Sequence, residues 1–197
     1  MNGFVLAGGR STRMGRDKAL LEYHGRPLIE HAVRLLREAG LRPHIVGSRP
    51  DLAQYAPVIS DLHEACGPLG GIEAALSATG SKWNLFLAVD LPLIPPAFLR
   101  YLQQRVSMTG AYATMPGVAG RAMPLCAIYH RALLPQIRSA LESGEYKVVR
   151  VIQHAAGNNL DQFSVEAVVT ARDDLRNSQM HRWFQNVNTP GDLALVI

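Results

Sequence analysis

The sequence has few cysteines and no long apolar runs. Its 197 residues include two cysteines, Cys66 and Cys126, which lie far apart and form no C-x-x-C pair. This excludes a disulfide framework and argues against a structural zinc site. No apolar run approaches the roughly 18–20 residues that span a bilayer, and the first residues have neither the basic flank nor the apolar core of a secretory signal. We therefore expect reduced cysteines, no membrane contact and a cytoplasmic location.

Aromatic residues are also scarce, at 7% of the chain, and the net charge is only +4. Lysine and arginine are scattered singly, without a basic stripe or interleaved stacking aromatics. Binding to nucleic acid is therefore not expected, because it needs a concentrated basic surface. The small positive excess instead fits a small anionic ligand.

Apolar runs of strand length alternate with segments of helical periodicity. Strands are predicted at residues 3–7, 44–46, 58–61, 84–89, 112–115 and 125–129, and helices at 27–39, 69–78 and 96–106. This alternation predicts an α/β fold with a mostly parallel central sheet. The length suits a single domain over residues 1–197. Ligands of such sheets bind at the carboxyl ends of the strands.

A glycine-rich segment follows the first predicted strand. Gly8 and Gly9 can turn backbone N–H groups towards an anion, and Arg13 and Lys18 add positive charge. A P-loop is excluded because Gly15 is not followed directly by lysine, and the G-x-G-x-x-G of dinucleotide loops is absent. The segment predicts a cradle for a nucleoside triphosphate. The alternative is a glycine-rich turn whose cations are merely solvated.

Asp90 follows the clearest buried strand and precedes Leu91 and Pro92, where proline ends strand pairing. Its carboxylate is therefore expected at the ligand-binding edge of the sheet. Mg²⁺ usually takes only one or two protein oxygens and completes its shell with phosphates and water. Asp90 suits that sparse coordination, although it could instead cap the helix that begins after Pro95.

Two asparagines, Asn186 and Asn188, flank Val187 near the end of the chain. In an extended segment both amides face one side while Val187 faces the core. The pair could meet a metal ion or a phosphate together. The same residues followed by Thr-Pro-Gly-Asp are also ordinary turn and helix-start chemistry.

The pattern L-A-G-G-x-S-x-R-M-G-x-D-K-A-L at residues 6–20 resembles the signature loop of the molybdenum cofactor guanylyltransferases, the MobA-like proteins. The resemblance continues in order through G-P-L-G-G at 67–71, A-V-D-L-P at 88–92, G-R-A-M-P-L at 120–125 and N-V-N-T-P-G-D-L at 186–193. It implies a three-layer, Rossmann-like fold of the nucleotidyltransferase type. It also implies transfer of GMP from GTP to molybdenum-molybdopterin, with release of pyrophosphate.

The resemblance assigns roles to individual residues. It implies catalytic roles for Arg13, Lys18 and Asp90, a Mg²⁺ site at Asp90 and Asn188, and acceptor binding by Arg121, Asn186 and Asn188. The nucleotide would be bound by Leu6, Ala7, Gly8, Gly9, Lys18, Asp61, Gly67, Pro68, Gly70 and Asp90. Asp61 could accept hydrogen bonds from guanine N–H donors or from ribose hydroxyls.

Two features bear on the substrates. Related cytidylyltransferases carry L-A-A-G where this chain has L-A-G-G, so Gly8 and Gly9 favour guanine. Met123 stands where many family members carry a polar residue before Pro124. The resemblance therefore does not determine how this chain binds the pterin. The expected partners are GTP and molybdopterin, together with cofactor-delivery proteins and molybdoenzymes. A nucleotidyltransferase that uses CTP or another acceptor, and a non-catalytic nucleotide-binding carrier, remain as alternatives.

Overall fold

A computed structural model describes residues 1–8, 17–63, 65–176, 179–187 and 192 of the chain. The strands are β1 (Asn2–Leu6), β2 (Glu22–Tyr23), β3 (Arg26–Pro27), β4 (Arg42–Val46), β5 (Val58–Ile59), β6 (Trp83–Ala88), β7 (Ala113–Val118), β8 (Arg121–Ala122), β9 (Cys126–His130) and β10 (Leu160–Ser164). The α-helices are α1 (Leu28–Glu38), α2 (Gly67–Ala78), α3 (Pro96–Thr109), α4 (Leu134–Glu142), α5 (Val148–Ala156) and α6 (Val165–Ala171). Short 3-10 helices are η1 (Lys18–Leu20), η2 (Pro50–Gln54), η3 (Arg131–Leu133), η4 (Gly157–Asn159), η5 (Asp173–Leu175) and η6 (Met180–Arg182).

The central sheet has the strand order β10-β7-β9-β6-β1-β4-β5, and β8 pairs with β7. Strand β1 runs parallel to β4 and to β6, β4 runs parallel to β5, and β10 runs parallel to β7. The prediction of a mostly parallel α/β sheet is confirmed. Strand β9 is the main exception, because it pairs antiparallel with both β6 and β7.

The direction of β9 follows from the tight turn that precedes it. Ala119 and Gly120, between β7 and β8, both have positive φ, at 47° and 74°. Two such residues form the turn that reverses a strand within a hairpin. The chain therefore returns beside β7 without the crossover helix that a parallel connection needs.

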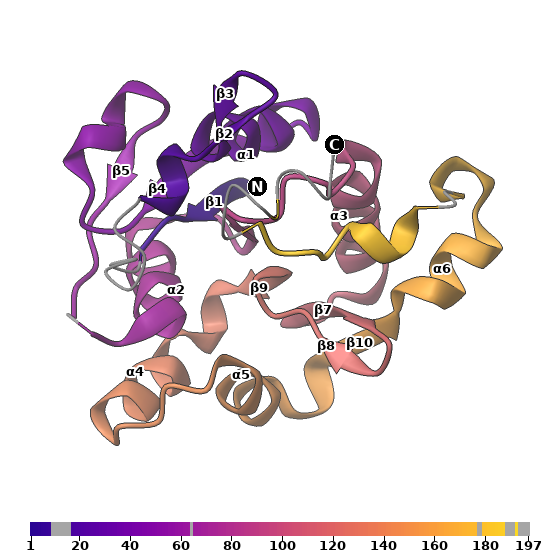
Figure 1. The fold of residues 1–197 in the computed structure, drawn as a ribbon. Helices are drawn as coiled ribbons and strands as arrows, with labels where there is room; N and C mark the ends of the chain where they lie inside the picture. The colour runs from indigo at the N-terminus through magenta and orange to yellow at the C-terminus, as the bar shows by residue number, and fades with distance from the viewer. Residues whose placement is uncertain (9–16, 64, 177–178, 188–191, 193–197) are drawn as a thin grey trace.

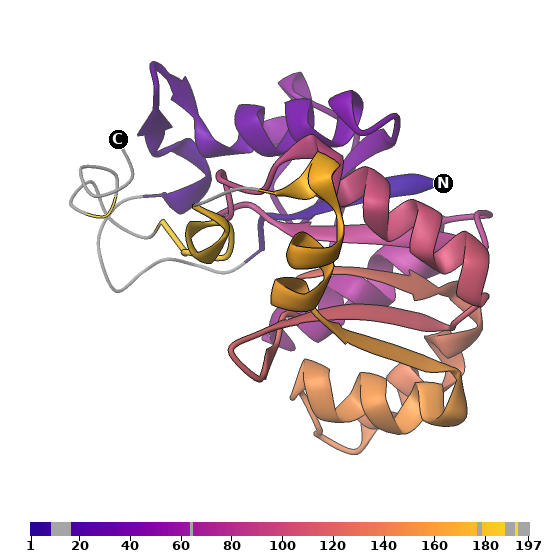
Figure 2. The same ribbon diagram turned by 90° about the vertical axis from the view of Figure 1, so that its right-hand side faces the viewer.

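Helices cover both faces of the sheet, which makes three layers (Figures 1 and 2). Within β1, Val5 packs into the core that α1 and α3 cover, whereas Phe4 and Leu6 pack into the core under α2, α4 and α5. Strand β6 is apolar on both faces in the same way, since Leu85 and Phe86 are fully buried in opposite cores. A central parallel strand needs this continuous apolar run because neither of its faces meets water.

Helix α2 begins earlier than the sequence indicated. The sequence predicts a start at Leu69, but the helix begins at Gly67, so Gly67 and Pro68 lie in its first turn with Gly70 rather than in a preceding loop. Proline is tolerated there because the first helical N–H groups have no partner within the helix. A Cβ on Gly71 would lie 3.2 Å from Leu6 Cδ2 and 3.3 Å from Val46 Cγ1. Glycine thus lets α2 approach the ends of β1 and β4.

This contact yields a stability prediction. Gly71→Val should lower the free energy of unfolding by about 1–3 kcal/mol, the usual cost of overpacking a core, because the added methyl groups meet Leu6 and Val46. Urea denaturation measures the change. Gly80→Val is the control, since a Cβ at Gly80 meets nothing within 4 Å. Equal stabilities of the two variants would show that the close approach of α2 is not required.

Candidate functional site

The candidate site lies at the carboxyl edge of the parallel strands, on the left of Figure 2. Ala7 and Gly8 follow β1, and the Ala7 N–H donates to the Val46 carbonyl at the end of β4, at 3.0 Å. The Val89 N–H after β6 donates to the Leu6 carbonyl at 3.3 Å. The ends of β4, β1 and β6 are therefore joined side by side, as the sequence predicts for a ligand-binding edge.

An ion pair joins Lys18 and Asp90 across this edge. Lys18 Nζ donates to Asp90 Oδ2, although the two residues lie 72 positions apart. The Lys18 side chain is 27% exposed and that of Asp90 is 11% exposed. Asp90 does not cap the following helix, because the cap of α3 is Pro95 and no side chain serves it. The alternative interpretation of Asp90 is therefore wrong, and its carboxylate is paired with the predicted phosphate-binding lysine.

Asp61 follows β5 and lies at the same edge of the sheet. A Cβ on Gly8 would lie 3.4 Å from Asp61 Oδ2, and a Cβ on Gly71 would lie 3.6 Å from Asp61 Oδ1. The carboxyl group therefore sits between the end of β1 and helix α2. Burial raises its pKa, and a hydrogen bond from the Ser48 backbone opposes that shift. A partly buried carboxylate with a raised pKa, at the carboxyl edge of the sheet, is suited to accept hydrogen bonds from a ligand.

The first turn of α2 borders this corner. Gly67 and Pro68 are exposed, while Gly70 is buried against Cys66, whose Cβ would lie 2.9 Å from a Cβ on Gly70. The free N–H groups of a helix start, together with its dipole, favour a negatively charged ligand. The positions of Gly67, Pro68 and Gly70 are therefore compatible with nucleotide binding, which stays a prediction.

The segment before the C-terminus returns to Asp90. The Val187 N–H donates to the Asp90 carbonyl at 3.0 Å, and the Val187 side chain is fully buried. Asn186, the preceding residue, is exposed. The inward direction of Val187 agrees with the extended pattern that the sequence predicts. It also brings the predicted acceptor-binding segment next to Asp90, the predicted metal ligand.

Arg121 lies in β8, opposite Val118 at the end of β7, and is exposed. Strands β7 and β6 point the same way, because each is antiparallel to β9. Arg121 is therefore at the same edge of the sheet as Asp90. The predicted site residues Gly9, Arg13 and Asn188 lie outside the described residues.

Sequence reasoning missed Arg49 at this edge. Its guanidinium bonds Asp17, the residue directly before Lys18, through Nη1 at 3.0 Å from Oδ1 and through a second contact from Nη2 to Oδ2. It also bonds Asp51. The available signal was an arginine just past Gly47, at the carboxyl end of a predicted strand.

Among the described residues, no group of three or more histidine, cysteine or acidic residues that could hold a metal occurs. Asp90 supplies one carboxylate at the edge, as expected for an ion whose other ligands are phosphate oxygens and water. Metal binding at Asp90 and Asn188 stays a prediction.

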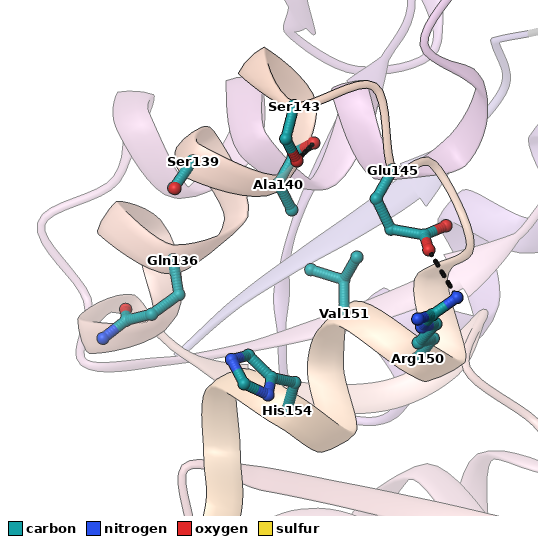
Figure 3. Close-up of a pocket in the computed structure, with 8 residues that line it drawn as sticks. All are labelled: Gln136, Ser139, Ala140, Ser143, Glu145, Arg150, Val151 and His154. Atoms are coloured by element: carbon teal, nitrogen blue, oxygen red, sulfur yellow. Dashed lines mark hydrogen bonds and ion pairs between the residues drawn. The ribbon is translucent and has the colours of Figure 1, made fainter.

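A separate pocket lies between α4 and α5 (Figure 3). It has a volume of about 480 Å³, and its wall combines side chains of both helices with Glu145 from the turn between them, which pairs with Arg150 at 3.2 Å. Its lining contains none of the residues predicted for the nucleotide. Across the part of the chain that the structure describes, no helix is long and apolar enough to span a membrane.

Comparison with known proteins agrees with this geometry. The sequence pattern of the MobA-like NTP transferase domain matches residues 3–178. The chain belongs to this family. As a MobA-like NTP transferase it is a nucleotidyltransferase, and the three-layer fold of that type is confirmed by the arrangement of its sheet and helices.

Two relatives and one crystal structure cover nearly the whole chain. A protein of Halalkalibacterium halodurans named probable molybdenum cofactor guanylyltransferase is 33% identical over 204 residues, with 98% of this chain and 95% of the relative covered. The molybdenum cofactor guanylyltransferase of Serratia proteamaculans is 33% identical over 190 residues, with coverages of 91% and 94%. Molybdopterin-guanine dinucleotide biosynthesis protein A of Archaeoglobus fulgidus superimposes with a TM-score of 0.80 at 25% identity, covering 99% of this chain and 96% of that one.

The raised pKa of Asp61 predicts that this carboxylate costs stability. An acid whose pKa is higher in the folded than in the unfolded protein binds its proton more tightly when folded. The stability it contributes is therefore full below the unfolded pKa of about 3.9 and is lost as the pH rises through the folded pKa. Asp61→Asn, which keeps an oxygen for the Ser48 N–H, should be more stable than the wild type at pH 7.

Urea unfolding of both proteins across the pH range measures this difference. The advantage of Asp61→Asn should shrink as the pH falls and approach zero only below about pH 3, where the wild-type carboxyl is protonated in both the folded and the unfolded state. All other ionisable groups are shared, so their contributions cancel in the difference. A variant that is less stable than the wild type at pH 7 would contradict the interpretation that the partly buried Asp61 carboxylate costs stability.

Proposed function

We propose that this protein transfers GMP from GTP to the terminal phosphate of molybdenum-molybdopterin, forming the guanine dinucleotide cofactor and pyrophosphate. The observation that carries the proposal is the Lys18–Asp90 pair at the carboxyl edge of the sheet. The pair supports the proposal because a lysine suited to bind phosphate and a carboxylate suited to bind Mg²⁺ lie together, in a chain whose relatives are named as guanylyltransferases. The proposal treats residues 1–197 as one nucleotidyltransferase domain.

The reaction joins two anions, so charge is the main obstacle. An oxygen of the acceptor phosphate attacks the α-phosphorus of GTP, the bond from the α-phosphorus to the bridging oxygen breaks, and pyrophosphate leaves with that electron pair. The acceptor oxygen is already ionised, so no general base is needed. Positioning and neutralisation supply most of the acceleration in phosphoryl-type transfers.

The residues of the chain divide this work. Lys18 would leave Asp90 to bind the triphosphate, and Arg13 would add a second cation. Asp90, with Asn188, would hold Mg²⁺, which when bound supplies positive charge against the phosphates. The base would lie near Asp61 and the first turn of α2.

The acceptor would bind on the side of Asp90 that faces away from the proposed GTP site. Arg121 is exposed at that edge and offers a planar, permanently charged group to an anion. Asn186 precedes the residue that is hydrogen-bonded to the Asp90 backbone. These two positions support a site for the pterin phosphate beside the α-phosphate of GTP.

Incubation of the protein with GTP, Mg²⁺ and molybdopterin carrying molybdenum tests the proposal. The expected result is release of pyrophosphate together with a guanine dinucleotide detected by mass spectrometry. Competition among nucleotides separates the alternatives. Preferential turnover of CTP would identify the protein as a cytidylyltransferase. Nucleotide binding without release of pyrophosphate would indicate a non-catalytic carrier.

Asp90→Asn isolates the role of the carboxylate. The variant keeps the size of the side chain but removes the charge, so Mg²⁺-dependent pyrophosphate release should fall by at least about a hundredfold, as when a principal electrostatic group is lost. Asp174→Asn is the matched control, because Asp174 forms an exposed pair with Arg172 at 2.8 Å, outside the proposed site. Retained activity in Asp90→Asn would remove Asp90 from the metal site.

A further inference from the structure

Arg49 is held between two carboxylates. Its Nη1 and Nη2 form a fork on Asp17, and its Nε and Nη2 form a second fork on Asp51, at 2.8 Å and 2.6 Å from Oδ1 and Oδ2. The hydrogen bonds to Asp51 and Asp17 raise the pKa of the guanidinium. Only arginine has planar N–H groups that can serve both forks at once, whereas lysine offers a single point charge.

Asp17 determines how Lys18 enters the site. Its Oδ1 accepts from the Ala19 N–H at 3.0 Å and so caps the short helix η1, whose first residue is Lys18. The same oxygen accepts from Arg49 Nη1 at 3.0 Å. The guanidinium therefore fixes the carboxylate that fixes the backbone of the phosphate-binding lysine.

The other end of this connection is built into the sheet. The Arg49 N–H donates to the Gly47 carbonyl at 2.8 Å, and a Cβ on Gly47 would lie only 3.0 Å from Gly8 N. Arg49 thus extends from a turn that packs against Gly8, the start of the predicted phosphate cradle. The contact of Arg49 with Asp17 therefore connects Lys18 and its neighbours to the turn that packs against Gly8.

Charge gives the contact a second effect. Asp17 places a negative charge directly beside Lys18, where a polyanionic triphosphate is expected. An unpaired carboxylate there would repel the phosphates. The guanidinium offsets this charge, while Asp51 holds the guanidinium in the plane that Asp17 needs.

We propose that Arg49 is a positioning residue for the nucleotide phosphates and acts through Asp17 to orient Lys18. The inference rests on the proposed function only in taking GTP as the nucleotide. Arg49 itself is not assigned a contact with the substrate. Its contribution therefore depends on the presence of the Asp17 carboxylate.

A double-mutant cycle on GTP affinity tests this dependence. Calorimetric titration with GTP and Mg²⁺, without acceptor, is carried out on the wild type, Arg49→Lys, Asp17→Ser and the double variant. Serine preserves an oxygen for capping η1 but removes the carboxylate. Arg49→Lys should raise the Kd for GTP about tenfold in the wild type, as expected for loss of about one charge-assisted hydrogen bond. In the Asp17→Ser background it should change the Kd by less than about twofold.

A second arginine fork provides the matched control. Arg105 binds Asp161 through Nε and Nη2, each at 2.7 Å, and connects α3 to β10 away from the nucleotide edge. Arg105→Lys should lower the thermal unfolding temperature without changing the Kd for GTP. If Arg49→Lys behaves like Arg105→Lys, its role is structural and the proposal is overturned.

The remaining outcomes also decide the question. Equal effects of Arg49→Lys in both backgrounds would mean that Arg49 contacts GTP directly, which overturns action through Asp17. Arg49→Lys should change the Kd for GMP less than the Kd for GTP, because Lys18 is proposed to bind the phosphates that GMP lacks. An equal change for both nucleotides would contradict the proposal. If the wild type binds CTP and not GTP, the proposed function fails, and the same cycle measured with CTP still decides the role of Arg49.

Discussion

The parallel pairing of β1 with β6 is the constraint on which the rest of the site depends. This pairing sets Leu6 opposite Ala88 and ends both strands at the same edge of the sheet. The residues that follow each strand then converge there. Lys18, which comes after the glycine-rich segment, meets Asp90, which comes after β6. The contact of Val187 with the Asp90 backbone brings the C-terminal segment to the same point.

Much of this edge could be predicted from local patterns. The apolar run at 84–89 identifies a strand buried on both faces, and the rule for parallel sheets then places Asp90 at the ligand-binding edge. Lys18 was predicted from its charge in the glycine-rich segment, and the inward direction of Val187 from the alternation of side chains in an extended segment. The direction of β9 was not, because apolar periodicity does not distinguish a hairpin return from a crossover. The hairpin turn needs a positive φ at both Ala119 and Gly120, and alanine carries no signal for that conformation.

Ion pairs between distant segments were beyond the reach of sequence patterns. Arg49 and Asp17 lie 32 residues apart, and their contact exists only because β4 lies beside β1. The start of α2 was placed two residues late, although Pro68 is a residue typical of the first helical turn. In both cases the chemistry of the residues was visible, but their tertiary neighbours were not.

The edge brings together several charged groups, and one of them, Asp61, is expected to cost stability. Asp61 is a carboxylate whose pKa is raised by burial, and Asp90 lies in a largely buried position with Lys18 as its partner. Such an arrangement is typical of sites where ligand binding, rather than folding, has determined the residues. The pocket between α4 and α5 contains one acidic side chain, Glu145, which pairs with Arg150 in the same wall (Figure 3).

A crystal structure with a non-hydrolysable GTP analogue and Mg²⁺ would test the central claim most directly. The account predicts the triphosphate at the carboxyl edge, with Lys18 on phosphate oxygens, the metal at Asp90 and the base between Asp61 and the first turn of α2. An analogue bound in the pocket between α4 and α5, with the Lys18–Asp90 pair unchanged, would contradict it.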